Sequence, residues 1–188
     1  NFNSKIDFDK KLNKNFSKIL NNHNFTNNIK YFKGDFNNNL SIELDNTYKV
    51  KDYNYSVSGK IEEGKFNLLG PFENDFIKDK ITEVYFSELQ FKTDLNKEKI
   101  KLQGIGKYSF DNLKFYNLNI ENEFNEDLIK LKLNLDFGNS LNIDLINYIK
   151  PPNTVANLSF DYEKKKKNIN INNFTLVEGS NSIKINEI

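Results

Sequence analysis

The stretch "VYFSELQF", residues 84–91, carries the pattern that decides the fold. Val84 and Phe86 alternate with polar residues, two polar residues follow, and Leu89 and Phe91 then resume the alternation. Alternation with a period of two residues is typical of a β-strand that buries one of its faces. The extra polar residue must therefore be absorbed by a bulge, a tight bend or a change of sheet face.

The same pattern recurs three times elsewhere, in "YKVKDYNY" from Tyr48, "YSFDNLKF" from Tyr108 and "ININNFTL" from Ile169. We expect the strands to be bent repeatedly in the same way, as a curved sheet or a stack of similar hairpins requires. The irregular spacing of these segments does not indicate a solenoid of fixed period.

Alternation of this kind predicts strands along most of the chain, separated by segments rich in turn-forming residues. The predicted strands cover residues 40–44, 84–91, 100–102, 108–110, 113–120, 129–137, 141–145, 158–162, 169–176 and 183–185. The predicted breaks are "EEGK", "DLNKEK", "NEDL", "FGNS", "KPPN" and "EKKKKN". The sequence therefore predicts a mainly β fold, a curved antiparallel sheet or groove of many strands.

Two segments carry helical periodicity instead. In residues 9–22, one face of a helix would present Leu12, Phe16, Ile19 and Leu20. A weaker candidate, "PFENDFIKDKI", starts at Pro71, and proline suits the first turn of a helix. We expect one short N-terminal helix beside the sheet.

Length and composition indicate one folded domain. The 188 residues include 17 Phe and 9 Tyr, which supply far more buriable surface than a disordered chain carries. Met is absent even at position 1, so we expect a fragment of a longer chain, with a helix-containing leading segment at 1–33 and a β-groove region at 34–188. No apolar run approaches the roughly 20 residues that span a bilayer, so an anchor would lie outside this fragment.

Charge and residue usage argue against several functions. The formal net charge is +1 and Arg is absent, so the chain lacks the field and the guanidinium groups that favour nucleic-acid binding. The absence of Cys removes disulfides, thiolate catalysis and Cys-based zinc sites. The run Lys164–Lys167 is interpreted as a charged hairpin tip, with contact to anionic lipid headgroups as the alternative.

No residue pattern indicates catalysis, a metal or a cofactor. The single histidine, His23, has no nucleophile elbow near it and is interpreted as a surface or capping residue. The acidic pairs at 62–63 and 126–127 are interpreted as solvated turn charges. Gly104 and Gly106 lack the third glycine and the helix of a phosphate loop, and we expect them to allow a bend or bulge. The chain is predicted not to be an enzyme.

The apolar faces of the strands are the main functional candidate. One N-terminal helix shields only a fraction of so large a sheet, and an exposed apolar sheet is an aggregation risk unless it forms a groove or meets lipid. The alternative is an ordinary sandwich, in which two sheets bury each other's apolar faces.

Three segments carry a resemblance to a known family: "LSIELDNTYKVKDYNYSVSGKIEEGKFNLLG", "KIKLQGIGKYSFDNLKFYNLNIEN" and "NININNFTLVEGSNSIKINEI". They repeat an apolar-x-apolar strand, a short Asn/Asp step, a second strand and a Gly-containing turn. In this rhythm the chain resembles the AsmA-like envelope proteins of Gram-negative bacteria, in particular the YhdP-type branch. The resemblance covers the region from residue 34 onward and includes no catalytic motif.

The resemblance implies a long periplasmic β-groove, anchored in the inner membrane by a helix outside this chain, along which phospholipid acyl chains move toward the outer membrane. Phospholipid and a membrane are then the expected partners, and no particular envelope protein is indicated. The residues expected to line the groove are Val84, Phe86, Leu89, Phe91, Ile100, Leu102, Leu131, Leu133, Leu135, Ile143 and Leu145.

Two other functions stay open. One is a self-contained β-sandwich that acts as a surface or adhesin-like interaction module through its polar loops. The other is an accessory domain of an enzyme. An inward Leu→Asp change separates groove from sandwich, because a groove loses lipid and stays folded whereas a buried unpaired charge unfolds a sandwich core.

Overall fold

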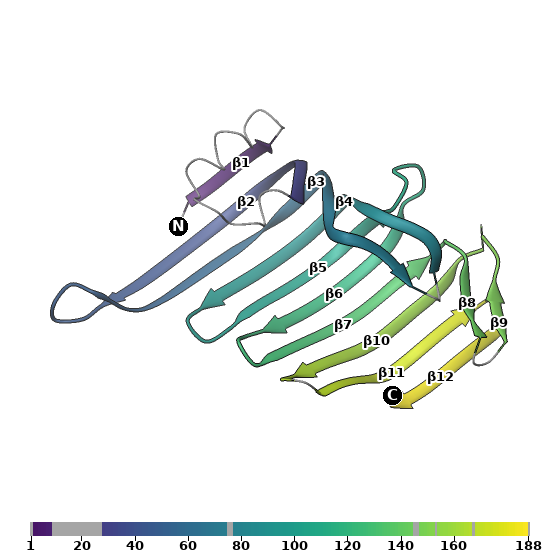
Figure 1. The fold of residues 1–188 in the computed structure, drawn as a ribbon. Helices are drawn as coiled ribbons and strands as arrows, with labels where there is room; N and C mark the ends of the chain where they lie inside the picture. Colours follow the sequence, from purple (N-terminus) through teal and green to yellow (C-terminus); the bar gives the residue numbers. More distant parts are fainter. Residues whose placement is uncertain are drawn as a thin grey trace.

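The fold is one long antiparallel sheet (Figure 1). The computed structural model describes residues 2–8, 28–74, 77–144, 147–152, 154–166 and 168–187. The strands are β1 (Phe2–Phe8), β2 (Ile29–Leu44), β3 (Val50–Asn74), β4 (Ile77–Asn96), β5 (Ile100–Ser109), β6 (Tyr116–Phe124), β7 (Leu128–Phe137), β8 (Leu141–Ile143), β9 (Tyr148–Lys150), β10 (Ala156–Lys165), β11 (Asn168–Glu178) and β12 (Asn181–Glu187).

Neighbouring strands in the sheet follow one another in sequence. Ten strands pair in the order β1-β2-β3-β4-β5-β6-β7-β10-β11-β12, and β8 and β9, which come between β7 and β10 in the sequence, form a separate two-stranded sheet. The large sheet is not closed, since β1 and β12 lie at its two edges. The predicted fold class, a mainly β curved antiparallel sheet, is confirmed.

The helical candidate that starts at Pro71 is wrong. Residues up to Asn74 belong to β3 and residues from Ile77 belong to β4, and the two strands pair with each other, Phe72 lying opposite Ile81. Main-chain hydrogen bonds made across this hairpin override the helical spacing of its apolar residues. The helix expected at residues 9–22 lies outside the described residues.

The break expected at "EEGK" is also wrong, because β3 runs through it. A bulge absorbs the change of phase there: Lys33 of β2 pairs with Glu63, whereas the next residue, Gly34, pairs with Ile61. The other five predicted breaks each contain a strand end. In the lysine run, β10 ends at Lys165 and β11 begins at Asn168, as a hairpin tip requires.

Three of the four segments in which the alternation is interrupted contain a β-bulge. In "VYFSELQF" the extra residue of β4 is Glu88, with φ of 52°, and in "ININNFTL" the extra residue of β11 is Asn173, with φ of 54°. In "YKVKDYNY" the register between β2 and β3 shifts beside Lys51. The fourth place, "YSFDNLKF", holds the turn between β5 and β6 instead. A bulge bends its strand, so these positions account for curvature in the sheet.

Gly106 of β5 lies directly against the β4 bulge. A Cβ atom at Gly106 would stand 2.5 Å from the Cα of Leu89, so no larger residue fits without a shift of the backbone. The expectation that this glycine accompanies a bulge is confirmed, although the extra residue belongs to the neighbouring strand.

The predicted boundary between a leading segment at 1–33 and a β region at 34–188 does not mark the start of the sheet. Strand β1 pairs with residues 32–38 of β2, and β2 itself starts at Ile29. The leading segment therefore contributes an edge strand to the same sheet.

Tight packing is concentrated where β7 leads into β8. The buried cluster at this end consists of Phe137, Leu141, Ala156 and Leu176. The β8–β9 hairpin covers this part of the sheet, with Ile143 and Tyr148 packed against the cluster, and Figure 1 shows the hairpin beside β10–β12. This hairpin gives the sheet one covered end.

Candidate functional site

One face of the sheet is apolar across most of its strands. Side chains at directly paired positions of antiparallel neighbours point to the same face. The register places one such row across four strands, made of Phe91, Gly104, Ile120 and Leu133. Because the bulge in β4 contains one extra residue, Phe86 and Leu89 also point to this face.

Most of the residues predicted to line a groove lie together on this face. They come from β4, β5 and β7, and each is half-buried: Val84, Phe86, Leu89, Phe91, Ile100, Leu102, Leu131, Leu133 and Leu135. Ile143 lies elsewhere than expected: it belongs to the covering β8–β9 hairpin and packs against the buried cluster. Leu145 lies outside the described residues.

The structure adds members of the face that the prediction left out. They are Phe36, Ile61, Leu118, Ile120, Leu158, Phe160 and Leu176. Their alternation is as regular in the sequence as that of the predicted residues. The missing information was the register, which decides whether two alternating strands share a face.

The apolar face is open toward the turns that join β2 to β3, β4 to β5 and β6 to β7. One row there is formed by Leu40, Tyr55, Leu95, Ile100, Phe124 and Ile129. Leu40 is 51% exposed and Ile129 is 38% exposed. At the opposite end the β8–β9 hairpin packs over the face, and β4 also contacts β8 there. A long apolar row in contact with solvent indicates a binding surface.

Several polar side chains interrupt the apolar face: Asn38, Thr93 and Asn122 lie in one row across the sheet. Asn122 of β6 pairs with Leu102 on one side and Leu131 on the other, so its amide lies between two leucines. Its Oδ1 atom is buried and has no hydrogen-bond partner. A buried acceptor of this kind is costly to leave unpaired, and a donor group on a bound molecule would satisfy it.

A carboxylate fastens the covering hairpin to the sheet. Glu178, at the end of β11, accepts a hydrogen bond of 2.7 Å from the hydroxyl of Tyr148 in β9 and one of 2.6 Å from the hydroxyl of Thr154. These bonds hold the pKa of Glu178 below its usual value. Burial, together with the bond to Glu178, raises the pKa of Tyr148 to about 12.

Lys150 is the one charged side chain that is fully buried in the described part of the chain. Its Nζ atom donates to the carbonyl oxygens of Asn139, at 2.7 Å, and Pro151, at 3.2 Å, and lies 5.7 Å from the centre of the Phe137 ring. Burial lowers the pKa of this amine. The contacts are all internal to the covered end, which assigns Lys150 a structural role there.

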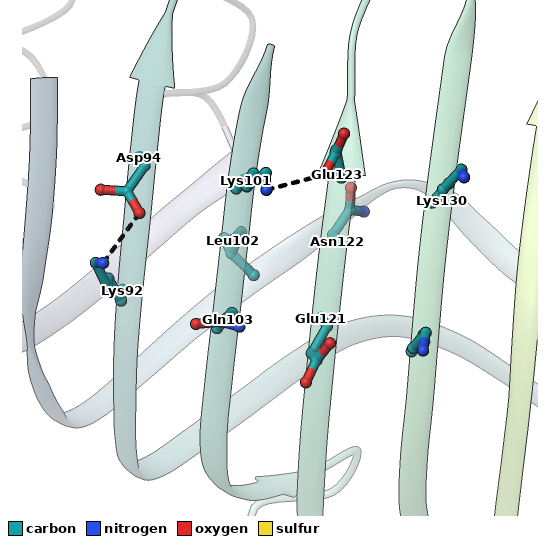
Figure 2. Close-up of a pocket in the computed structure, with 10 residues that line it drawn as sticks. Lys92, Asp94, Lys101, Leu102, Gln103, Glu121, Asn122, Glu123 and Lys130 are labelled. Carbon is teal, nitrogen blue, oxygen red and sulfur yellow. Dashed lines mark ion pairs between the residues drawn. The ribbon is translucent and has the colours of Figure 1, made fainter. Parts of the chain in front are cut away.

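The opposite face of the sheet carries interleaved cations and carboxylates. Lys101 Nζ lies 3.3 Å from Glu123, and Lys92 Nζ lies 3.2 Å from Asp94. Figure 2 shows these side chains around a depression of about 370 Å³ over β4–β7. Because lysines and carboxylates are paired within β4 and between β5 and β6, the depression lacks the single-sign field that attracts a charged ligand.

The residues considered for chemistry do not form a reaction centre in the described ranges. Glu62 lies in β3, where the Nζ atom of Lys33 is 3.0 Å away and holds the pKa of this carboxyl below its usual value. No group of three or more potential metal ligands occurs among the described residues. None of the described segments forms a helix long and apolar enough to cross a membrane. His23 lies outside the described residues.

Comparison of the chain with models of protein families, with curated proteins and with solved structures found no match.

Proposed function

We propose that the apolar face of the sheet binds the acyl chains of phospholipids. The observation that carries the proposal is the asymmetry of the sheet. One face is predominantly apolar and the β8–β9 hairpin covers it at one end only, whereas the other face carries paired charges. A protein that buried this face in its own core would need a second layer of similar size. The two-stranded β8–β9 sheet is far smaller.

The physical basis is removal of apolar surface from water. Each Å² of acyl chain and protein surface buried contributes about 25 cal/mol, without directional demands. Side chains such as Leu102, Leu131 and Leu133 therefore hold a chain without fixing its position along the sheet. Acyl chains are bound across several strands and can slide, which is the property a transport surface requires.

The same proposal extends to cellular role. Resemblance to the AsmA-like envelope proteins supports a periplasmic protein, anchored in the inner membrane through a segment outside this chain, that assists phospholipid transport between the inner and outer membranes. An open sheet suits long acyl chains, because the polar headgroup of the phospholipid can stay in water at the edge of the sheet.

The test compares two neighbouring residues of β7 that point to opposite faces. Leu133 lies on the apolar face and Lys132 on the ion-paired face. The chain is purified from bacteria, and native mass spectrometry with lipid extraction measures bound phospholipid in the wild type, Leu133→Asp and Lys132→Asp. Far-UV circular dichroism measures the sheet in all three.

We expect phospholipid on the wild type and on Lys132→Asp, and its loss from Leu133→Asp with the sheet signal retained. A lipid-free, monodisperse wild type contradicts the proposal and favours a self-contained interaction module. Unfolding of Leu133→Asp alone contradicts it as well, because it would show that this leucine belongs to a closed core.

A further inference from the structure

The hairpin that joins β2 to β3 projects beyond the rest of the sheet. Pairing of β1 with β2 ends at Asn38, and pairing of β3 with β4 ends at Asn54. Residues 40–53 therefore form a two-stranded hairpin with no described neighbour on either outer edge, and Figure 1 shows it extending past the turn between β4 and β5. We call these residues the projecting hairpin.

The projecting hairpin continues the apolar face of the sheet. Leu40 pairs with Tyr55, Ile42 with Tyr53, and Leu44 with Val50, so the apolar side chains of both strands point to one side. Leu40, Ile42, Leu44 and Val50 are each about half exposed, at 50–53%. The opposite side carries polar residues, including the ion pair between Lys51 and Glu43. The hairpin is amphipathic, and its apolar side has no partner in the described part of the chain.

The tip of the hairpin presents a tyrosine to solvent. Tyr48 is 87% exposed and has a φ of 60°, a left-handed conformation that is unfavourable for a bulky residue. Hydrogen bonds hold the turn around it, because Asp45 Oδ1 accepts from the backbone N–H groups of Thr47, at 2.7 Å, and Lys49, at 3.0 Å. A strained, solvent-exposed aromatic residue on a hydrogen-bonded turn points to a function outside the fold.

We infer that the projecting hairpin lies in the interface of a lipid bilayer, with its apolar side toward the acyl chains and Tyr48 at headgroup level. Tyrosine favours this depth because its ring is apolar and its hydroxyl is polar. The inference rests on the proposed lipid-binding face in one respect: the apolar row of the hairpin is continuous with that face through Leu40 and Tyr55. Acyl chains would then pass between bilayer and sheet along the same predominantly apolar face.

The charges of the hairpin define which bilayer it fits. It carries three carboxylates and two lysines, Glu43, Asp45, Asp52, Lys49 and Lys51, for a net charge of −1. Attraction to anionic lipid therefore does not drive binding, and a zwitterionic surface is the expected partner.

The free edges of the hairpin define its depth. Unpaired N–H and C=O groups are too costly to place in the hydrocarbon core, where water cannot bond to them. The hairpin must lie flat, with its apolar side buried about 5–10 Å at the boundary between headgroups and acyl chains. A deep, membrane-crossing position is excluded by the same reasoning.

The absence of tryptophan from the chain makes a direct test possible. In the full chain, Tyr48→Trp introduces a single tryptophan reporter at the tip, and Ser41→Trp introduces one on the polar side of the same hairpin. Each variant is titrated with vesicles of phosphatidylcholine and with vesicles that also contain phosphatidylglycerol. Quenchers attached at shallow and deep acyl positions report the depth of the indole.

We expect a lipid-dependent blue shift for Tyr48→Trp, stronger quenching from the shallow position than from the deep one, and no tighter binding to the anionic vesicles. Replacing Ile42 and Leu44 by serine in this background should weaken vesicle partitioning about tenfold or more, because most of the buried apolar surface is lost. The indole of Ser41→Trp should remain in water.

Three outcomes overturn the inference. One is an unchanged Tyr48→Trp spectrum with both vesicles, and another is an equal shift for Ser41→Trp. The third is a shift without lipid that grows with protein concentration, which would identify a second copy of this chain as the occupant. Failure here is distinguishable from failure of the proposed function, because phospholipid bound to the sheet is measured separately by native mass spectrometry.

Discussion

Replacing Leu176 and Leu40 by alanine tests whether the two ends of the apolar face differ as described. Leu176 is 1% exposed and belongs to the buried cluster, whereas Leu40 is 51% exposed on the open part of the face. The chemistry of the two changes is identical, so the environment alone determines the difference in the free energy of unfolding.

The expected magnitudes follow from burial. At Leu176 the change removes buried methyl groups and leaves a cavity, which costs about 3 kcal/mol. At Leu40 half of the side chain is already in water and no cavity forms, so the cost is about 1 kcal/mol.

Urea unfolding followed by far-UV circular dichroism measures both variants. With a urea m-value of about 2 kcal/mol/M, Leu176→Ala should lower the midpoint by about 1.5 M and Leu40→Ala by about 0.5 M. Equal shifts would refute the reasoning, because they would mean that the open part of the face is covered in solution. Adding lipid micelles should not change the Leu176→Ala shift.

Two further predictions concern the covered end. The pKa of Glu178 is lower in the folded state than its unfolded value of 4.5, so its bonds to Tyr148 and Thr154 stabilise the fold above pH 4.5, and this stabilisation is lost as the pH falls through the folded-state pKa. Glu178→Gln should therefore lose less unfolding free energy than the wild type between pH 5 and pH 3. An equal loss in both proteins would contradict this role. Lys150→Met removes the ammonium group that donates to two backbone carbonyls, and urea unfolding should show a loss of about 1–3 kcal/mol in unfolding free energy. A variant as stable as the wild type would show that desolvation of the ammonium cancels its hydrogen bonds.

The strands and their bulges follow from local rules that a sequence displays. Side chains in "IKLKLNLDF" alternate without interruption, and β7 spans them. The two adjacent polar residues in "VYFSELQF" mark the bulge at Glu88, because only an extra residue keeps Phe86 and Leu89 on one face. These signals depend on near neighbours alone, so the sequence marks where the alternation is interrupted, whereas the choice among bulge, bend and change of face required the register.

The errors occur where distant pairing decides the outcome. Residues around Pro71 have helical spacing, yet the partner strand β4 supplies their hydrogen bonds. "EEGK" looks like a turn, yet Glu62 is a bulge inside a strand. The placement of Ile143 in a covering hairpin also depends on long-range packing against Leu176 and its neighbours. For the candidate site, alternation identified residues of β4, β5 and β7 that share the apolar face, whereas the exposed apolar side of the projecting hairpin required the register.

The sequential order of the strands sets how such a sheet can change in size. Adjacent strands are about 4.8 Å apart, so the ten strands form a surface about 43 Å wide. Insertion or deletion of one hairpin between neighbours preserves the alternating direction of all remaining strands and changes the width by about 10 Å. The reach of the apolar surface is thus a modular quantity, adjustable in steps of one hairpin without altering the connections elsewhere in the fold.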